Sequence, residues 1–295
     1  MRSFDRKLAR RMQLTANDAS RKGGAAGGAS AFARRVTDCG GLWQFPPMAC
    51  NPVSIVTVTH NGYLFVRLLV EKVRALTADR PYEIIVVDRG STDGTREWLG
   101  QQPDVRVIRK RYWWRKGHAH GEAAEAGVQA AQYERIVLLD SDAHPLTGDW
   151  LTESADRLDD NHRLAGAVFR DAHAGNPHGW YIHPHFMAFF KSDLGGLIVL
   201  RKLRGHATDT GEEATLRVLD AGKGVIGHEI RFAQQFDVGH PRVPTIAGGV
   251  FHAWYVTRLL KDDRDVARET GGVVSRATYL EPLMAKLRSH HALSY

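Results

Sequence analysis

Apolar and polar positions follow two different periods in the central part of the chain. Residues 53–59 and 82–87 are runs of β-branched and aliphatic side chains of strand length, and turn-forming residues bound them. Between these runs, residues 64–77 place apolar side chains at helical spacing with charged residues in between. A strand, a helix and a second strand within about 35 residues predict a right-handed parallel βαβ unit.

The alternation continues as far as residue 139. The pattern predicts a helix over 94–99, a strand over 105–108, a helix over 122–131 and a strand over 135–139. Alternating strands and helices predict an α/β fold with a doubly wound, mostly parallel sheet flanked by helices. Residues 256–295 are charged and amphipathic, which predicts a helical C-terminal tail.

The first 50 residues differ in composition from the rest. Residues 23–30 contain only Gly, Ala and Ser, which is typical of a linker. Nine Lys or Arg and three Asp within residues 1–51 give +6 of the formal net charge of +7. We therefore expect a basic, low-complexity and flexible leader over residues 1–50, without a basic patch spread over the folded body.

The basic leader bears on the expected partners and location. Such an arm is usually a solvated tail, although its charge also suits anionic lipid or nucleic acid. No run of about 18 apolar residues occurs, and the first 30 residues lack the apolar stretch of a secretion signal. We expect a cytoplasmic protein with no transmembrane segment. A weak membrane-surface contact through the arm would make it membrane-peripheral, and nucleic acid is the less favoured partner.

Polar and acidic residues follow the predicted strands at their carboxyl ends. Thr59-His60-Asn61 follows the first strand, Asp88 opens a Gly-rich turn after the second, and Asp140-Ser141-Asp142 follows the fourth. Ligands of open α/β sheets bind at this edge. Because Asp140 and Asp142 are two residues apart in an extended segment, both carboxylates can face one divalent cation, Mg²⁺ or Mn²⁺. Taken alone, each motif also fits a capped turn.

Three segments occur in order along the chain: IVTVTHNG, EIIVVDRGSTDGT and YERIVLLDSDAHP. Together they resemble the family 2 inverting glycosyltransferases of GT-A fold, from residue 51 to about residue 252. The resemblance implies a GT-A-like sheet with a smaller acceptor-side region. It also implies transfer of a sugar, with inversion, from a nucleotide-diphosphate sugar such as a UDP-, GDP- or dTDP-sugar to an acceptor hydroxyl.

The resemblance also predicts the domain organisation. A GT-A domain would extend over 51–255, with a nucleotide-binding half over 51–145 and an acceptor-binding half over 146–255. The leader over 1–50 would precede it, and a helical extension over 256–295 would follow.

Roles at the donor site follow from the resemblance position by position. Asp88 is implied to contact the nucleobase, with Thr59 and Asn61 beside the nucleotide pocket. Asp140 and Asp142 are implied to hold the sugar diphosphate and the metal, with Asp142 as the direct ligand.

Two further roles fall later in the chain. An inverting enzyme needs a general base for the acceptor hydroxyl, and the resemblance places it at a helix start after the DxD motif, which is Asp140-Ser141-Asp142 in this chain. Asp209 is the first choice and Glu212 the second; plain capping acids are the alternative. His252 falls where a late histidine completes the metal site, and imidazole beside carboxylates suits Mn²⁺. The alternative for His252 is a packed core histidine.

Two further segments bear on the donor and acceptor sites. Residues 116–122 replace the family's usual Gly- and Asn-rich stretch. Residues 181–187 contain His183 and His185, and the resemblance implies that they form a wall of the sugar and acceptor cleft. The alternative is a Pro-bent strand with solvent-facing histidines.

Two other functions stay open. A nucleotidyltransferase shares the sheet and the acidic ligands, but it usually has a Gly-rich basic loop after the first strand, which residues 59–62 do not offer. A nucleic-acid-binding protein would use the basic arm and the Trp113-Trp114 loop, with strong salt dependence. The sugar, the acceptor and the oligomeric state do not follow from the sequence.

Overall fold

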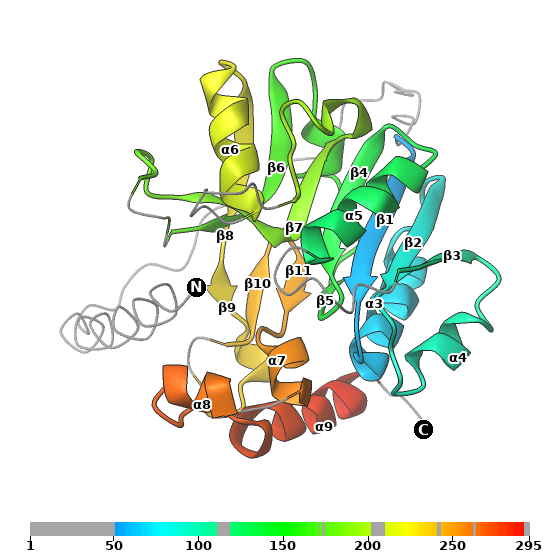
Figure 1. Ribbon diagram of the computed structural model, residues 1–295, viewed down its shortest axis with the longest axis vertical. Helices are drawn as coiled ribbons and strands as arrows, with labels where there is room; N and C mark the ends of the chain where they lie inside the picture. The colour runs from blue at the N-terminus through cyan, green and yellow to red at the C-terminus, as the bar shows by residue number, and fades with distance from the viewer. Residues whose placement is uncertain are drawn as a thin grey trace, which may run out of the picture. The chain divides into compact units, whose positions relative to one another are not determined.

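A seven-stranded sheet, in the order β3-β2-β1-β4-β7-β6-β8, forms the centre of the part of the chain described by the computed structural model (Figure 1). That part comprises residues 51–110, 119–170, 172, 175–201, 210–240, 243–261 and 264–291. The strands are β1 (Val53–Thr59), β2 (Tyr82–Asp88), β3 (Val105–Arg109), β4 (Arg135–Asp140), β6 (His162–Phe169), β7 (Tyr181–Phe190) and β8 (Gly224–Glu229). β7 is antiparallel to its neighbours β4 and β6, and the other pairings are parallel. The prediction of a mostly parallel α/β sheet is confirmed.

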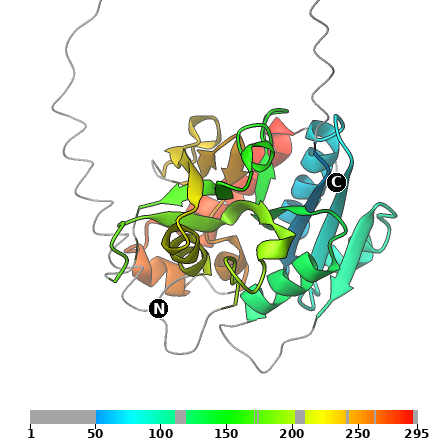
Figure 2. The same cartoon turned by 90° about the horizontal axis from the view of Figure 1, so that it is seen from above.

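Helices cover both faces of this sheet, and Figure 2 shows α3 and α5 on opposite sides. The covering helices are α3 (Tyr63–Leu76) and α4 (Thr95–Leu99) on one face, and α5 (Ala119–Ala130) and α6 (Thr210–Asp220) on the other. Successive strand side chains point to opposite faces, so Ile55 of β1 packs with α3 whereas Val56 packs with α5. Helix α5 approaches β1 closely because Gly127 has no side chain; a Cβ there would lie 2.5 Å from Val56 Cγ1.

A second, antiparallel sheet continues from the end of β4, and the sequence pattern does not predict it. Its order is β5-β11-β10-β9, and its strands are β5 (Ala143–Pro145), β9 (Arg231–Phe232), β10 (Thr245–Ala247) and β11 (Val250–His252). Each strand has only two or three residues, which is too short for a period of two to be visible. The small sheet begins directly after Asp142, so it extends the main sheet's carboxyl edge.

Beside the end of β4, strand β7 contains a bulge. The β6–β7 register passes from Gly166 opposite Met187 to Val168 opposite Ile182, so residues 183–186 oppose the single residue Ala167. Gly166 has φ 148°, and a Cβ there would overlap the carbonyl oxygen of Phe186. Bulges re-aim side chains at sheet edges. This one places His183 and His185 next to the carboxyl end of β4, where Leu139 pairs with Phe186.

The chain after β11 is helical, as predicted. It forms α7 (Val256–Lys261), α8 (Arg264–Glu269), a π-helical turn (Arg276–Leu280) and α9 (Glu281–His290). A third apolar cluster joins these helices to Leu64, Phe65 and Leu68 of α3. Three 3₁₀ turns complete the described elements: Ala155–Arg157, Lys191–Asp193 and Gln234–Phe236.

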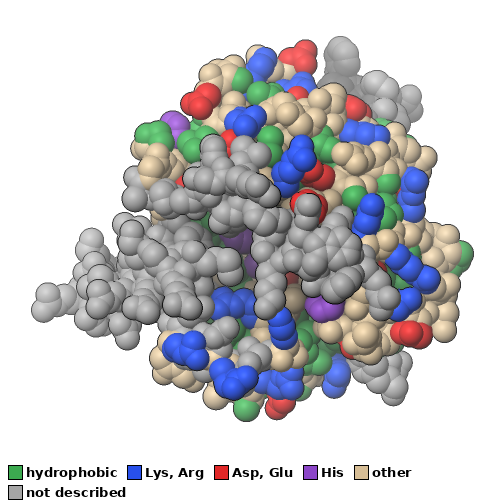
Figure 3. Space-filling model, viewed as in Figure 1, with side chains coloured by type: hydrophobic (Ala, Val, Ile, Leu, Met, Phe, Trp, Pro, Cys, Tyr) green, Lys and Arg blue, Asp and Glu red, His purple; other side chains and the backbone are tan. Residues whose placement is uncertain are grey.

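Surface charge is uneven on the face shown in Figure 3. Lys and Arg side chains gather at its lower edge, where Figure 1 places the C-terminal helices. Lys261 of α7 and Arg264 and Arg268 of α8 are exposed. Within the described ranges, no helix combines the length and the apolar character needed to cross a membrane.

Candidate functional site

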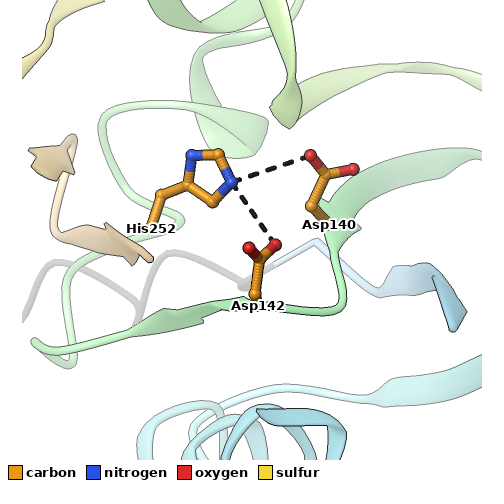
Figure 4. A group of neighbouring side chains, drawn as sticks. All are labelled: Asp140, Asp142 and His252. Carbon is orange, nitrogen blue, oxygen red and sulfur yellow. Dashed lines mark ion pairs between the residues drawn. The ribbon is translucent and has the colours of Figure 1, made fainter. Parts of the chain in front are cut away.

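Asp140, Asp142 and His252 come together at the carboxyl edge of the main sheet. Nε2 of His252 lies 3.3 Å from Oδ1 of Asp142 and 3.8 Å from Oδ2 of Asp140. Figure 4 shows the imidazole nitrogen directed between the two carboxylates. One ligand atom from each residue lies within 4.8 Å of the others. Two carboxylates and an imidazole in this arrangement could hold a metal ion.

The small sheet brings His252 to the two aspartates. Asp140 ends β4, Asp142 follows in a tight turn, and β5 then pairs with β11 so that His252 lies opposite Ala143. The backbone N–H of Ala253 donates to the carbonyl oxygen of Asp142 at 3.1 Å, which fixes the turn against the end of β11. A residue more than 100 positions away in the sequence thus reaches the DxD motif through strand pairing.

His120, in the first turn of α5, contacts the same cluster from a third direction. Its Nε2 lies 3.5 Å from Oδ1 of Asp140. Burial alone would raise the pKa of Asp140, but the contact with His120 and the charges of His120, His252 and His183 outweigh it and lower the pKa to about 2. Asp140 is therefore ionised at neutral pH. His120 belongs to residues 116–122, which replace the Gly- and Asn-rich stretch expected from the resemblance. This departure is the feature of the sequence that points to His120.

His185 is fully buried beside the cluster. Its ring stacks on that of His252, with ring centres 4.2 Å apart and an angle of 10° between planes. The prediction of solvent-facing histidines is wrong for His185, because the β7 bulge turns its ring toward the end of β11. Burial, followed by the charges of His252 and His183, lowers its pKa well below the ordinary value, so the ring is neutral at pH 7.

Tyr279 joins the site from the C-terminal π-helical turn. It is fully buried, and its hydroxyl donates to the carbonyl oxygen of Ala253, next to His252. Burial, with smaller contributions from Asp142 and Tyr255, raises the pKa of Tyr279 well above its ordinary value. Nothing in the local sequence identifies this residue, because its contact depends on how the C-terminal helices pack.

The predicted nucleotide residues form a hydrogen-bonded corner at the ends of β1 and β2. Asp88 is buried, and its Oδ1 accepts hydrogen bonds from the backbone N–H (3.0 Å) and the hydroxyl (2.6 Å) of Ser91. The Asn61 N–H donates to Ser91 Oγ, and Asn61 Oδ1 accepts from the Thr92 N–H at 2.8 Å. The buried hydroxyl of Thr59 has no hydrogen-bond partner among the described residues. The corner is thus ordered by Asp88, and its nucleotide contacts remain predictions.

Of the two candidate bases, the structure describes one. Glu212 lies in the first turn of α6, is 1% exposed, and accepts a hydrogen bond from Nδ2 of Asn176 at 2.9 Å. Gly211 allows this turn to approach β7, because a Cβ there would overlap the carbonyl oxygen of Ile182. Asp209 lies outside the described residues, as do the Trp113-Trp114 loop and the predicted leader.

Comparison with known families decides the assignment. The profile described as Glycosyl transferase family 2 matches residues 54–217, more than half of the chain, and the match includes most of β1, Asp88, the DxD motif and the start of α6. The chain belongs to glycosyl transferase family 2. The GT-A-like fold expected from the sequence agrees with this membership.

Individual relatives are more distant. An uncharacterized protein, y4gI, from Sinorhizobium fredii (strain NBRC 101917 / NGR234) is 32% identical over 118 residues, which are 38% of this chain and 12% of that protein. The chain therefore spans about an eighth of that relative's length.

Two solved structures resemble this family 2 chain more loosely. One is a mannosyltransferase from Pyrobaculum calidifontis in complex with GDP-Man and Mn²⁺, with 18% identity, a TM-score of 0.46 and coverage of 82% of this chain and 76% of that one. The other is glucosyl-3-phosphoglycerate synthase from Mycobacterium tuberculosis in complex with Mn²⁺, UDP and phosphoglyceric acid. It has 20% identity, a TM-score of 0.46 and coverage of 61% and 69%.

Proposed function

We propose that this family 2 member transfers a sugar from a nucleotide-diphosphate sugar to an acceptor hydroxyl with inversion at the sugar carbon. One observation carries the proposal: in a chain of this family, Asp140, Asp142 and His252 converge at the carboxyl edge of the sheet, the edge at which α/β proteins bind ligands.

The donor atoms of this cluster fit a divalent transition metal. The pair of carboxylates suits Mg²⁺ or Mn²⁺, and the added imidazole favours Mn²⁺. Two carboxylates with little exposure lie next to the same imidazole nitrogen, and a cation bound between these groups would balance their negative charge. A bound Mn²⁺ would supply positive charge that neutralises the diphosphate leaving group.

The chain's own groups would then divide the work. Asp142 and His252 would hold the cation, and Asp140, nearer to His120, would orient the donor sugar diphosphate. A single displacement with inversion needs a base that accepts the acceptor's hydroxyl proton as the new bond to the sugar carbon forms. Asp209, which precedes α6 in the sequence, or Glu212, in the first turn of α6, would take that proton.

The nucleoside would bind at the neighbouring corner. Asp88 and Asn61 order the loop after β2, and the unsatisfied hydroxyl of Thr59 offers a hydrogen-bonding group to a ligand there. UDP-, GDP- and dTDP-sugars are all candidate donors. We also propose a cytoplasmic location with weak membrane-surface contact through the basic residues of positions 1–50.

The test is a thermal-shift panel of nucleoside diphosphates and nucleotide sugars with and without Mn²⁺, followed by assays of nucleotide release. A ligand that binds only the native state raises the melting temperature. We expect release to require the metal and Asp142→Asn to abolish it. Asp160→Asn is the matched control, because the Asp160 side chain is almost fully exposed in the turn before β6; it should retain wild-type release.

Two results would contradict the proposal. Metal-independent nucleotide release, or full activity of Asp142→Asn, would remove the role of the cluster. Pyrophosphate release from a nucleoside triphosphate would instead identify a nucleotidyltransferase.

A further inference from the structure

Among the described residues, the imidazole of His252 has no partner of the kind that usually orients a metal-binding histidine. Such residues almost always donate their second ring N–H to a carboxylate, a carbonyl or water. Nδ1 of His252 is buried and makes no hydrogen bond to any described residue. No group of the described residues therefore fixes the plane of this ring through a hydrogen bond at Nδ1.

Two flat rings contact the His252 imidazole instead. His185 stacks on it at 4.2 Å with an interplanar angle of 10°, and Trp254 lies 4.5 Å away at 46°. The indole N–H of Trp254 donates to Thr245 Oγ1 at 2.7 Å, and Thr245 pairs with His252 across β10 and β11. His252 is 3% exposed and His185 is fully buried, so neither ring has room to rotate freely.

The His185 ring is itself held in place. The backbone N–H of His185 donates to Nδ1 of His183 at 3.2 Å, so this His183 nitrogen is an acceptor. Nδ1 of His185 lies 2.8 Å from the same nitrogen and must therefore carry the proton of that second hydrogen bond. Nε2 of His185 makes no hydrogen bond to a described residue. The face of the ring, rather than its second nitrogen, is therefore what His185 presents to the cluster.

The position of His185 is built into the backbone. The bulge in β7, which requires Gly166 opposite it, turns residues 183–186 away from regular pairing at the point where β7 adjoins the end of β4. A regular strand would leave only one residue opposite Ala167 and could not present both His183 and His185 here.

We propose that His185 is a positioning residue that orients the metal ligand His252 by ring stacking. The inference rests on the proposed function, because it assumes that His252 binds the cation. By holding the imidazole plane, His185 directs Nε2 of His252 at the space between Asp140 and Asp142. Because the ring is already ordered in the metal-free protein, less conformational entropy is lost when the metal binds.

Two substitutions separate the flat ring from the other properties of His185. His185→Phe and His185→Leu both remove the hydrogen bond to His183 and both fill the buried space with apolar atoms, but only Phe keeps a planar ring. Mn²⁺ binding to the full chain is measured by electron paramagnetic resonance of free Mn²⁺, so the readout does not depend on turnover. We expect His185→Leu to bind Mn²⁺ about 10-fold more weakly and His185→Phe to stay within about 3-fold of wild type.

Controls define the site and the fold. Asp142→Asn should abolish the binding, and His162→Leu, which alters an exposed histidine at the opposite end of the sheet, should not change it. Circular dichroism and melting curves confirm that each variant is folded. If His185→Leu does not fold, His185→Met, which is also apolar and has no planar ring, takes its place in the comparison with His185→Phe.

Three outcomes overturn the inference. A wild-type affinity in folded His185→Leu means that the ring is not needed. Equal weakening in both variants assigns the effect to the hydrogen bond with His183, which both lack, and weakening in His185→Phe alone means that a planar ring at this position does not support Mn²⁺ binding. In each of these cases Mn²⁺ still binds the wild type, so the proposed function survives; absence of Mn²⁺ binding to the wild type would reject the proposed metal role itself.

Discussion

At the scale of single residues, Glu212 is a buried acid, and its substitution tests whether it is the general base. Glu212→Gln keeps the side-chain length and an oxygen that can accept from Asn176, but it removes the group that can take a proton. If Glu212 is the base, turnover should fall by about 100-fold or more, while donor binding stays unchanged. Steady-state kinetics, together with titration of the nucleotide sugar, measures both quantities.

The neighbouring residue provides a matched control. Glu213 lies one position along α6, and its Oε1 pairs with Nε of Arg217 at 2.7 Å. Glu213→Gln should keep turnover within about 2-fold, since exchanges of partly exposed ion pairs have small effects. Wild-type turnover in Glu212→Gln would reject Glu212 as the base and leave Asp209 as the candidate.

The sequence predicts some of the site residues and not others for a physical reason. Asp140 and Asp142 can be predicted because a buried strand places them two residues apart at its end, and the family pattern adds His252 at a distance. His120, His185 and Tyr279 reach the cluster only through contacts between separate segments. The alternative of a Pro-bent strand with solvent-facing histidines is wrong for His185, because the local sequence does not reveal the bulge in β7 that buries this ring.

At the scale of elements, the β7 bulge depends on Gly166, and an alanine there should destabilise the sheet. The added Cβ would overlap the Phe186 carbonyl oxygen while the backbone is held at φ 148°. Steric overlap and backbone strain each cost about 1–3 kcal/mol, so Gly166→Ala should lower the free energy of unfolding by about 3 kcal/mol. Denaturant unfolding measures this quantity, and Mn²⁺ affinity should fall as well because His185 shifts.

Gly148 offers the matched control for that substitution. It is exposed, its backbone requires no positive φ, and no atom lies within 4 Å of a Cβ built there. Gly148→Ala should change the unfolding free energy by less than about 0.5 kcal/mol. Equal effects at the two positions would show that the bulge does not need glycine.

The long elements of the main sheet could be predicted, and the small sheet could not. β1, β2 and β4 are buried on both faces, so they appear as continuous apolar runs, and α3 between them shows a clear helical period. β5, β9, β10 and β11 have two or three residues each, and pairing between distant segments rather than local pattern defines them. Yet this small sheet is what brings His252 to the DxD motif.

At the scale of the whole molecule, the C-terminal helices share an apolar cluster with α3. Leu64 and Phe65 of α3 pack with Leu283 and Leu287 of α9, while other side chains of α3, including Val66 and Leu69, pack against the main sheet. A domain boundary after residue 255 remains a prediction from the sequence. If α3 couples the two clusters, the C-terminal helices should not unfold separately from the sheet.

Leu283→Ala tests that coupling. Leu283 is fully buried, and removal of a buried leucine side chain costs about 2–5 kcal/mol. We expect the free energy of unfolding to fall by this amount while far-ultraviolet circular dichroism and tryptophan fluorescence report one coincident transition, because α9 and the sheet unfold together. Ser289→Ala, at an exposed position of the same helix, should leave the transition unchanged. Two separated transitions in Leu283→Ala would show instead that residues 256–295 form an independent extension. If Mn²⁺ binding also stayed intact after the first transition, Tyr279 would not be needed to hold the end of β11.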